Sequence, residues 1–277
     1  PFDETLLGGL SKIDLSKYAA IVLPEKGRLA PPVCEKLDAF VEKGGVLLAA
    51  GQPAPVSCLG LASPARKRDD LLGATLSVGE SWQSSFPHLA NRPYVMLGKS
   101  YWEAEYAGDV TRIGALLPPV PFGPPELSYP QEPPTACPAL TCRAYGRGKA
   151  LYVPWYPGTG YYQNGFENWR LFLADVLFEL CGLASPAVRV SPMVEITHGK
   201  GEGFEAVHFV NGSGHFGSSF FEPEVLADQT VAIPWDKATV TCENLDEPGN
   251  LQYTLADGVL TITVPKLSAH ACVVVTE

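Results

Sequence analysis

The sequence predicts an α/β domain followed by a small antiparallel β-sandwich. Residues 18–50 show a strand–helix–strand pattern, in which two continuous apolar runs flank an amphipathic segment. Near residue 190 the hydrophobic period changes from about 3.6 to about 2, and it keeps that value to the end of the chain. A content of 46% hydrophobic and 18% charged residues in a chain of 277 is typical of a folded protein with room for two domains.

Residues 18–50 are expected to form a βαβ unit. The run YAAIVLP, residues 18–24, is apolar throughout, as in a strand that is buried on both faces. A double proline at 31–32 suits the first turn of a helix, apolar residues then recur at helical spacing, and Gly44-Gly45 provides a left-handed stop. The run VLLAAG, residues 46–51, follows as a second buried strand, and such crossovers are right-handed.

Shorter elements are expected between this unit and the sandwich. Three short strands, a hairpin and a long helix are predicted, at 94–97, 101–106, 112–117, 138–155 and about 165–181. The hairpin turns at residues 146–148. Asn164 and Glu167 form a capping box for the helix, and Gly182 ends it. Segment 118–134 holds eight prolines and is expected to be a surface excursion without regular structure.

Alternating patterns beyond the segment LASPAVRVSP, residues 183–192, predict the sandwich. Its candidate strands are 193–198, 204–211, 229–234, 238–243, 250–255, 259–264 and 270–276. Asp257-Gly258 has the composition of a tight hairpin turn. The string GKGEGF, residues 199–204, faintly resembles a phosphate-binding loop but joins two strands, so we expect a hairpin tip. The predicted domains are therefore residues 1–185 and 190–277.

The net charge and the cysteines indicate which kinds of partner and which cellular compartment the sequence favours. A formal net charge of −10 works against nucleic-acid binding, and no apolar run approaches the roughly 20 residues that a membrane helix needs. Seven cysteines without a C-x-x-C pair are expected to be buried free thiols, which favours a reducing, cytoplasmic compartment. The chain starts with PFDETLL, which reads as the middle of a fold, so we expect a fragment of a longer polypeptide.

No nucleophile stands where an α/β enzyme of this pattern needs one. A nucleophile elbow requires Ser or Cys on a strained turn directly after a strand, and here the strand 46–50 leads into Gly51 and Gln52. Gln52 is therefore a degenerate nucleophile position. Cys58, in the string VSCLG, is an alternative nucleophile, although a packed loop thiol is the simpler interpretation.

Acidic residues and histidines give no further catalytic pattern. Glu103 and Glu105 lie two apart on one predicted strand face, and we interpret them as solvated edge residues, because the acid–base pair of a glycoside hydrolase must flank a bond from different elements. The five histidines show no ligand spacing with Cys, Asp or Glu. We therefore predict no metal site and no cofactor.

The aromatic segment PWYPGTGYYQNGFENW, residues 154–169, is the strongest candidate for contact with a ligand or partner. Four of its aromatic residues follow a predicted strand: Trp155, Tyr156, Tyr161 and Tyr162. They lie at the edge where open α/β sheets form their crevice, and aromatic faces can stack on sugar rings. Two more are assigned to the helix core: Phe166 and Trp169. For the loop residues, a domain or subunit interface, local packing and contact with a sugar all stay open.

The strings YAAIVLP, GGVLLAAG and GRGKALYVPWYPGTGYY, followed by an amphipathic helix, resemble a known module. This is the flavodoxin-like, class I glutamine amidotransferase-like domain called the β-galactosidase trimerisation domain, which follows the catalytic barrel in family 42 β-galactosidases and related glycoside hydrolases. The resemblance covers about residues 1–183, and in that family a small β-sandwich closes the chain. Amidotransferases carry Cys at the elbow and His-Pro-Glu after the last strand, whereas this sequence has Gln52 and Tyr156-Pro157-Gly158.

The resemblance implies a non-catalytic accessory or oligomerisation region of a glycoside hydrolase. Its partners would be the catalytic barrel of the same polypeptide, identical subunits, or carbohydrate. The family module begins with a further strand and helix, so the first domain is expected to be incomplete at its amino-terminal end. Two alternatives stay open: a carbohydrate-binding module that uses Trp235 or Phe220 and Phe221, and a stand-alone amidotransferase-like hydrolase that uses Cys58.

Overall fold

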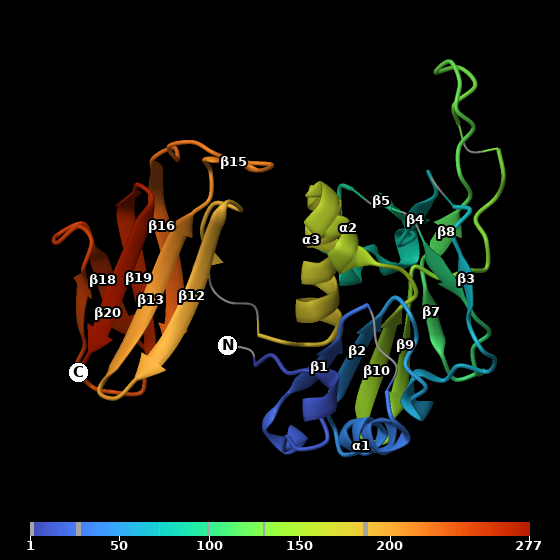
Figure 1. The fold of residues 1–277 in the computed structure, drawn as a ribbon, viewed down its shortest axis with the longest axis horizontal. Helices are drawn as coiled ribbons and strands as arrows, with labels where there is room; N and C mark the ends of the chain where they lie inside the picture. Colours follow the sequence, from blue (N-terminus) through green and yellow to red (C-terminus); the bar gives the residue numbers. More distant parts are fainter. Residues whose placement is uncertain are drawn as a thin grey trace. The chain divides into compact units, whose positions relative to one another are not determined.

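The computed structural model describes residues 3–25, 29–71, 73–92, 94–98, 100–129, 131–184 and 188–277. The chain divides into two compact units, Asp3–Ala184 and Ser185–Glu277. In the described residues most of the regular structure is β-strand, arranged in several small sheets, and helices are few (Figure 1). In the described part of the first unit, the strands form three sheets, of five, three and two strands.

A five-stranded mixed sheet forms the centre of the first unit. Its strands, in spatial order, are β1 (Ala20–Leu23), β2 (Val46–Ala50), β10 (Gly148–Val153), β9 (Leu140–Tyr145) and β7 (Thr111–Ile113). β1, β2 and β10 run parallel, and Leu48 pairs with Val22 on one side and Leu151 on the other. β9 is antiparallel to β10, and β7 is antiparallel to β9. The two predicted parallel strands and the predicted hairpin are thereby confirmed. β1, however, is an edge strand in which Val22 is 49% exposed, so the expectation that it is buried on both faces is wrong.

Helices and apolar side chains cover both faces of this sheet (Figure 1). α1 (Pro31–Glu42) begins at the predicted double proline, and its Leu37 shares a core with Leu47 of β2. α3 (Glu167–Ala174) lies on the other face, where Trp169 shares a core with Leu48. Successive strand residues point to opposite faces, and burying one leucine contributes roughly 1.5–3 kcal/mol, so β2 is held from both sides.

Two smaller sheets complete the first unit. One contains β5 (Tyr94–Met96), β4 (Thr75–Ser77) and β8 (Ala115–Leu117), and the other pairs β3 (Arg66–Arg68) with β6 (Tyr101–Glu103). The predicted strand 112–117 is divided at Gly114, whose φ is +68° and where a Cβ atom would collide with the Ser77 carbonyl oxygen. Its two halves, β7 and β8, therefore join different sheets.

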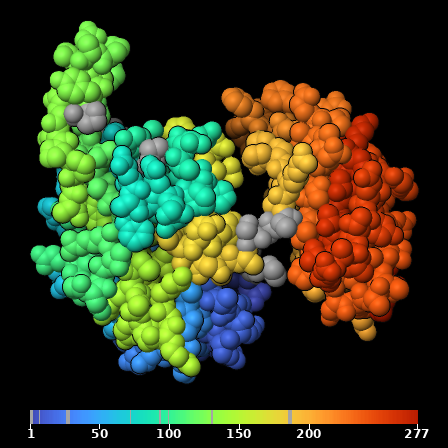
Figure 2. All heavy atoms as spheres, turned by 180° about the vertical axis from the view of Figure 1, so that it is seen from behind, coloured from blue at the N-terminus to red at the C-terminus, as the bar shows by residue number. Residues whose placement is uncertain are grey.

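The proline-rich segment 118–134 contains no helix or strand among its described residues, as predicted. It extends away from the sheets of its unit (Figures 1 and 2). Several of its side chains are exposed, including Phe122 and Tyr129.

The predicted helix over about 165–181 is confirmed, since α3 and the turn that follows it span residues 167–180, but a separate helix before it was not predicted. The structure has α2 (Pro157–Asn164), then α3, then a π-helical turn, Asp175–Leu180. Gly165 adopts a φ of +64° and separates α2 from α3, because this left-handed conformation interrupts a right-handed helix. The predicted capping box is wrong: Asn164 is the last residue of α2, and Phe166 is the N-cap of α3 without a side-chain cap hydrogen bond.

The second unit contains two four-stranded antiparallel sheets. One has the order β11 (Val188–Arg189), β16 (Leu226–Pro234), β19 (Val259–Leu267), β18 (Gln252–Ala256), and the other β12 (Val194–Gly201), β13 (Phe204–Asn211), β20 (His270–Thr276), β17 (Thr241–Asn244). A small hairpin joins β14 (His215–Phe216) to β15 (Ser219–Phe220).

Side chains from both four-stranded sheets form one core, as in a β-sandwich. Phe209 of β13 and Ile262 of β19, for example, are both fully buried in it. Asp257 and Gly258 have positive φ angles of 51° and 75° and connect β18 to β19, which confirms the predicted tight turn. The string 199–204 forms the tip of the β12–β13 hairpin, also as predicted.

Two further sequence expectations concern membranes and thiols. Within the described part of the chain, no helix is long and apolar enough to cross a membrane. The described residues include all seven cysteines, and all of these are free. Only three are fully buried and four are partly exposed, so the expectation of uniformly buried thiols is only partly met.

Candidate functional site

The carboxyl ends of β1, β2 and β10 meet at one edge of the central sheet, where open α/β sheets form their binding crevice. β1 is followed by Glu25, β2 by Gly51 and Gln52, and β10 leads through Tyr156 into α2. This brings the predicted degenerate nucleophile position close to the aromatic segment. We call these residues, together with Trp102 and Thr159, the carboxyl-edge site.

The Tyr156 ring closes the space directly above Gly51. Gly51 has a φ of +69°, and a Cβ atom at this position would collide with the Tyr156 ring. The Tyr156 hydroxyl accepts a hydrogen bond from the Trp102 indole N–H at 2.7 Å, and the Gly51 carbonyl accepts one from the Tyr152 hydroxyl at 2.8 Å. The ring is therefore fixed in a position that leaves no room for a side chain at residue 51.

The Glu25 carboxylate occupies the N-terminus of α2. It accepts hydrogen bonds from the Gly158 N–H at 2.5 Å, from the Thr159 N–H at 2.9 and 3.0 Å, and from the Thr159 hydroxyl. Glu25 is 9% exposed and has a φ of +26°, which is uncommon for a residue other than glycine. A negative charge is favoured at this end of a helix, where N–H groups lack partners within the helix.

Neither predicted nucleophile position supplies reactive chemistry at this edge. Gln52 is exposed and forms no hydrogen bond with a described residue, and an amide does not act as a nucleophile. Cys58 lies in the 3₁₀ helix Ser57–Leu59 and is fully buried. Burial raises the pKa of the Cys58 thiol, and the neighbouring Asp38 raises it further, so the reactive thiolate is disfavoured.

The aromatic residues of segment 154–169 separate into core and surface. Trp155 is fully buried and donates its indole N–H to the Ala139 carbonyl at 2.9 Å, so it fits local packing among the three alternatives. Tyr161 and Tyr162 lie on α2, which the sequence analysis treated as a loop, and they are 37% and 92% exposed. Of the two residues assigned to the core, Trp169 is buried, but Phe166 is 46% exposed.

The structure also places the two acidic residues and the tryptophan that the sequence analysis considered, Glu103, Glu105 and Trp235. β6 ends at Glu103, so Glu105 lies outside the strand on which both were expected. Glu103 forms an ion pair with Arg66 at 2.6 Å, and Glu105 is exposed, which fits solvated edge residues. Trp235 is 5% exposed and donates to the Thr239 carbonyl at 2.9 Å, so within the carbohydrate-binding alternative it offers no surface to a sugar.

The β14–β15 hairpin carries the remaining predicted sugar contacts. Phe220 and Phe221 are 80% and 68% exposed, and the His215 ring stacks on Phe220 with a centroid distance of 4.7 Å. They have the exposure that a sugar-binding or partner-binding surface requires.

An Asp–His pair that the sequence analysis missed lies beside α3. Asp175 is completely buried in the π-helical turn, and its carboxylate accepts hydrogen bonds from the His88 N–H at 3.0 Å and the Leu89 N–H at 3.1 Å. It also lies 2.6 Å from the His88 ring nitrogen Nδ1. The two residues are 87 positions apart, so sequence spacing gave no signal for this pair.

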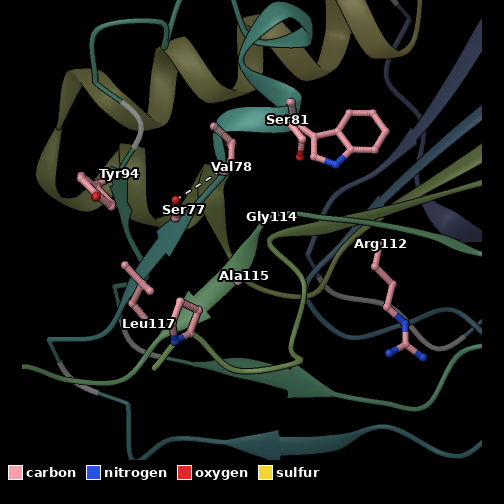
Figure 3. A pocket seen from close by; sticks show the side chains of 11 residues that line it. Ser77, Val78, Ser81, Tyr94, Arg112, Gly114, Ala115 and Leu117 are labelled. Carbon is pink, nitrogen blue, oxygen red and sulfur yellow. Dashed lines mark hydrogen bonds between the residues drawn. The ribbon is translucent and has the colours of Figure 1, made fainter. Parts of the chain in front are cut away.

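A pocket of about 440 Å³ opens in the first unit (Figure 3). Residues of β4, β5, β7 and β8 line it, together with the 3₁₀ helix Glu80–Ser85 and Pro134. Arg112 and Tyr94 lie on opposite sides of the view, with Ser77, Gly114 and Ala115 between them. The pocket brings together a cation, aromatic rings and hydroxyls, whose positions in the sequence show no common motif.

Solved structures with a similar fold include an α-L-fucosidase and several β-galactosidases. No protein-family model matches the sequence, and no curated protein matches it either. Among solved structures, the α-L-fucosidase isoenzyme 2 from Paenibacillus thiaminolyticus is similar over 96% of this chain and 42% of its own, with a TM-score of 0.66 and 18% identity.

Two β-galactosidases are similar in the same way. The cold-adapted enzyme from Rahnella sp. R3 matches over 95% of this chain and 33% of its own, with a TM-score of 0.56 and 16% identity. The enzyme from Bacillus circulans sp. alkalophilus matches over 95% of this chain and 34% of its own, with a TM-score of 0.57 and 15% identity. The chain shares its fold with parts of glycoside hydrolases. It spans between a third and about two fifths of the length of these three proteins.

Proposed function

We propose that this chain is a non-catalytic accessory region of a glycoside hydrolase. In this proposal the first unit is an amidotransferase-like, flavodoxin-like domain that serves in assembly. The observation that supports it most is the closed carboxyl-edge site. Tyr156 covers Gly51, Glu25 takes the free N–H groups of α2, and Gln52 stands where an enzyme of this kind needs a nucleophile.

The surface of α2 supports a role in contact with identical subunits. Tyr161 and Tyr162 project from it, and both Phe166 and Met96 nearby in the same unit are about half exposed. Exposed tyrosines of this kind are enriched at protein interfaces, because they bury a large apolar ring and keep a polar hydroxyl. The catalytic barrel of the same polypeptide is the second partner that we propose, and the compartment is cytoplasmic.

Sedimentation velocity on the chain at several concentrations tests the assembly role. We expect the wild-type chain to self-associate, and we expect Tyr161→Ala combined with Tyr162→Ala to weaken this association about tenfold or more, since truncating interface tyrosines often costs more than about 1 kcal/mol each. Tyr129→Ala combined with Tyr253→Ala is the matched control. These tyrosines are 54% and 41% exposed and lie away from α2 in the sequence, so this variant should associate like the wild type.

Two results would count against the proposal. A chain that stays monomeric at all concentrations, or that associates equally well in the α2 double variant, removes the assembly role. Glutaminase or esterase turnover by the purified chain, abolished by Cys58→Ala, would contradict the non-catalytic role and favour a hydrolase.

A further inference from the structure

The pocket in the first unit is rich in hydrogen-bond donors. It is lined by Ser77, Val78, Gly79, Ser81, Trp82, Tyr94, Arg112, Gly114, Ala115, Leu117 and Pro134. None of these side chains is acidic, although the chain has 30 Asp and Glu residues against 20 Lys and Arg. Its volume of about 440 Å³ lies within the range of roughly 300–1,000 Å³ that is typical of small-molecule sites.

The Trp82 indole N–H is a donor that has no partner among the described residues. The other four tryptophans donate to the Tyr156 hydroxyl or to the carbonyls of Ala139, Met96 and Thr239. The Trp82 indole forms no hydrogen bond with a described residue, although the side chain is half-buried and packs against the core. A half-buried indole usually finds a partner for its N–H, so this donor is available to a ligand.

Arg112 supplies a positive charge that no carboxylate of the described chain neutralises. Five other arginines form ion pairs with Asp or Glu. Among the described residues, the Arg112 guanidinium faces the Tyr106 ring, whose centroid lies 5.6 Å from the guanidinium carbon. This contact leaves the N–H groups at the edge of the guanidinium free, and their planar arrangement matches a carboxylate.

The hydroxyls and small residues complete the arrangement (Figure 3). The Ser77 hydroxyl accepts the Gly79 N–H at 3.2 Å and keeps its own proton to donate, and Ser81 and Tyr94 have no hydrogen bond from their hydroxyls to a described residue. Gly114 and Ala115 line the pocket between these polar groups (Figure 3). A ligand that fits must therefore be rich in acceptors, carry a negative charge and offer an apolar ring face.

We propose that this pocket binds a pyranose sugar that carries a carboxylate, that is, a hexuronic acid. The carboxylate pairs with Arg112, the ring oxygens and hydroxyls accept from Trp82, Ser81 and Ser77, and the C–H face of the ring lies against an aromatic side chain. This inference goes beyond the accessory role, because assembly through α2 needs no ligand in the pocket.

Isothermal titration calorimetry with the intact chain tests this inference. Glucuronate and galacturonate are the probes, their methyl esters keep the ring and remove the charge, and benzoate keeps a carboxylate on a ring that is not a sugar. We expect saturable binding of at least one uronate, about tenfold weaker binding of its methyl ester, and weaker binding of benzoate. A lost charge-assisted hydrogen bond of about 1.5–3 kcal/mol corresponds to about tenfold or more in affinity.

Variants connect the binding to this pocket. We expect Arg112→Gln to reduce uronate affinity about tenfold and to leave the affinity of the methyl ester unchanged, and Trp82→Phe to weaken both ligands several-fold. Arg147→Gln is the matched control, because Arg147 is also exposed and forms no ion pair with a described residue. Circular dichroism checks that each variant is folded. Absent uronate binding, equal binding of benzoate, or an equal loss in Arg147→Gln would each overturn the proposal.

Discussion

Glu25 shows how one residue can close a site that the surrounding fold leaves open. Its carboxylate is held by the first N–H groups of α2 and by the Thr159 hydroxyl, and its backbone adopts a φ of +26°. Such a conformation costs roughly 1–3 kcal/mol in a residue other than glycine. Favourable placement of a charge at a helix N-terminus, together with several hydrogen bonds to that charge, offsets this cost.

Replacing Glu25 should destabilise the first unit, and alanine should do so more than glutamine. Glu25→Gln keeps an acceptor but removes the charge, and we expect a loss of about 1–2 kcal/mol, whereas Glu25→Ala should lose about 2–4 kcal/mol because the N–H groups of Gly158 and Thr159 lose their acceptor. Urea unfolding measures both values, and hydrogen exchange should accelerate at these two amides. Glu105→Gln, at an exposed glutamate, serves as the control and should change nothing. Unaltered exchange in Glu25→Ala would contradict this account.

The elements of the first unit differ in how far the local sequence determines them. α1 and β2 were predictable because apolar periodicity, the prolines and the double glycine all favour the same structure. α2 was not, since its sequence PGTGYYQN has two glycines and no apolar stripe. The partner that caps it, Glu25, lies more than 130 residues earlier in the chain, and such a distant contact leaves no local pattern.

Distant contacts also explain the other errors at this scale. Gly114 divides a predicted strand because the Ser77 carbonyl lies against it, and Trp155 is buried because its ring packs against Phe172 of α3. For the same reason the carboxyl-edge site was predicted only in part. Gln52 and Tyr156 were found from the strand pattern, whereas Glu25 and the residues of the pocket come from elements that only the tertiary fold brings together.

The π-helical turn after α3 depends on a single buried carboxylate. Asp175 accepts two backbone N–H groups and faces the His88 ring, so Asp175→Asn places an amide NH₂ against at least one donor. We expect a loss of about 2–4 kcal/mol in the free energy of unfolding, because a buried donor or acceptor is left without a partner. Glu179→Gln is the control, since Glu179 lies in the same turn but is exposed, and this substitution should leave the free energy of unfolding unchanged. Equal stability of Asp175→Asn and wild type in urea would exclude this role.

At the scale of the whole molecule, the chain contains separate cores on either side of residue 185. The first unit buries residues on both faces of its mixed sheet, and the second buries residues between two antiparallel sheets. The change of hydrophobic period near residue 190 predicted such a division from the sequence alone. A domain with its own core can unfold as an independent unit.

Matched leucine truncations should therefore act on different unfolding transitions. Leu151 of β10 and Leu260 of β19 are both completely buried, and truncation to Ala at such positions costs about 2–5 kcal/mol. In differential scanning calorimetry we expect two transitions, with Leu151→Ala lowering only that of the first unit and Leu260→Ala only that of the sandwich. The same loss of free energy shifts Tm about twice as far in a domain of fewer than about 100 residues, so the sandwich transition should move more. A single transition that both variants lower equally would mean that the two cores unfold together.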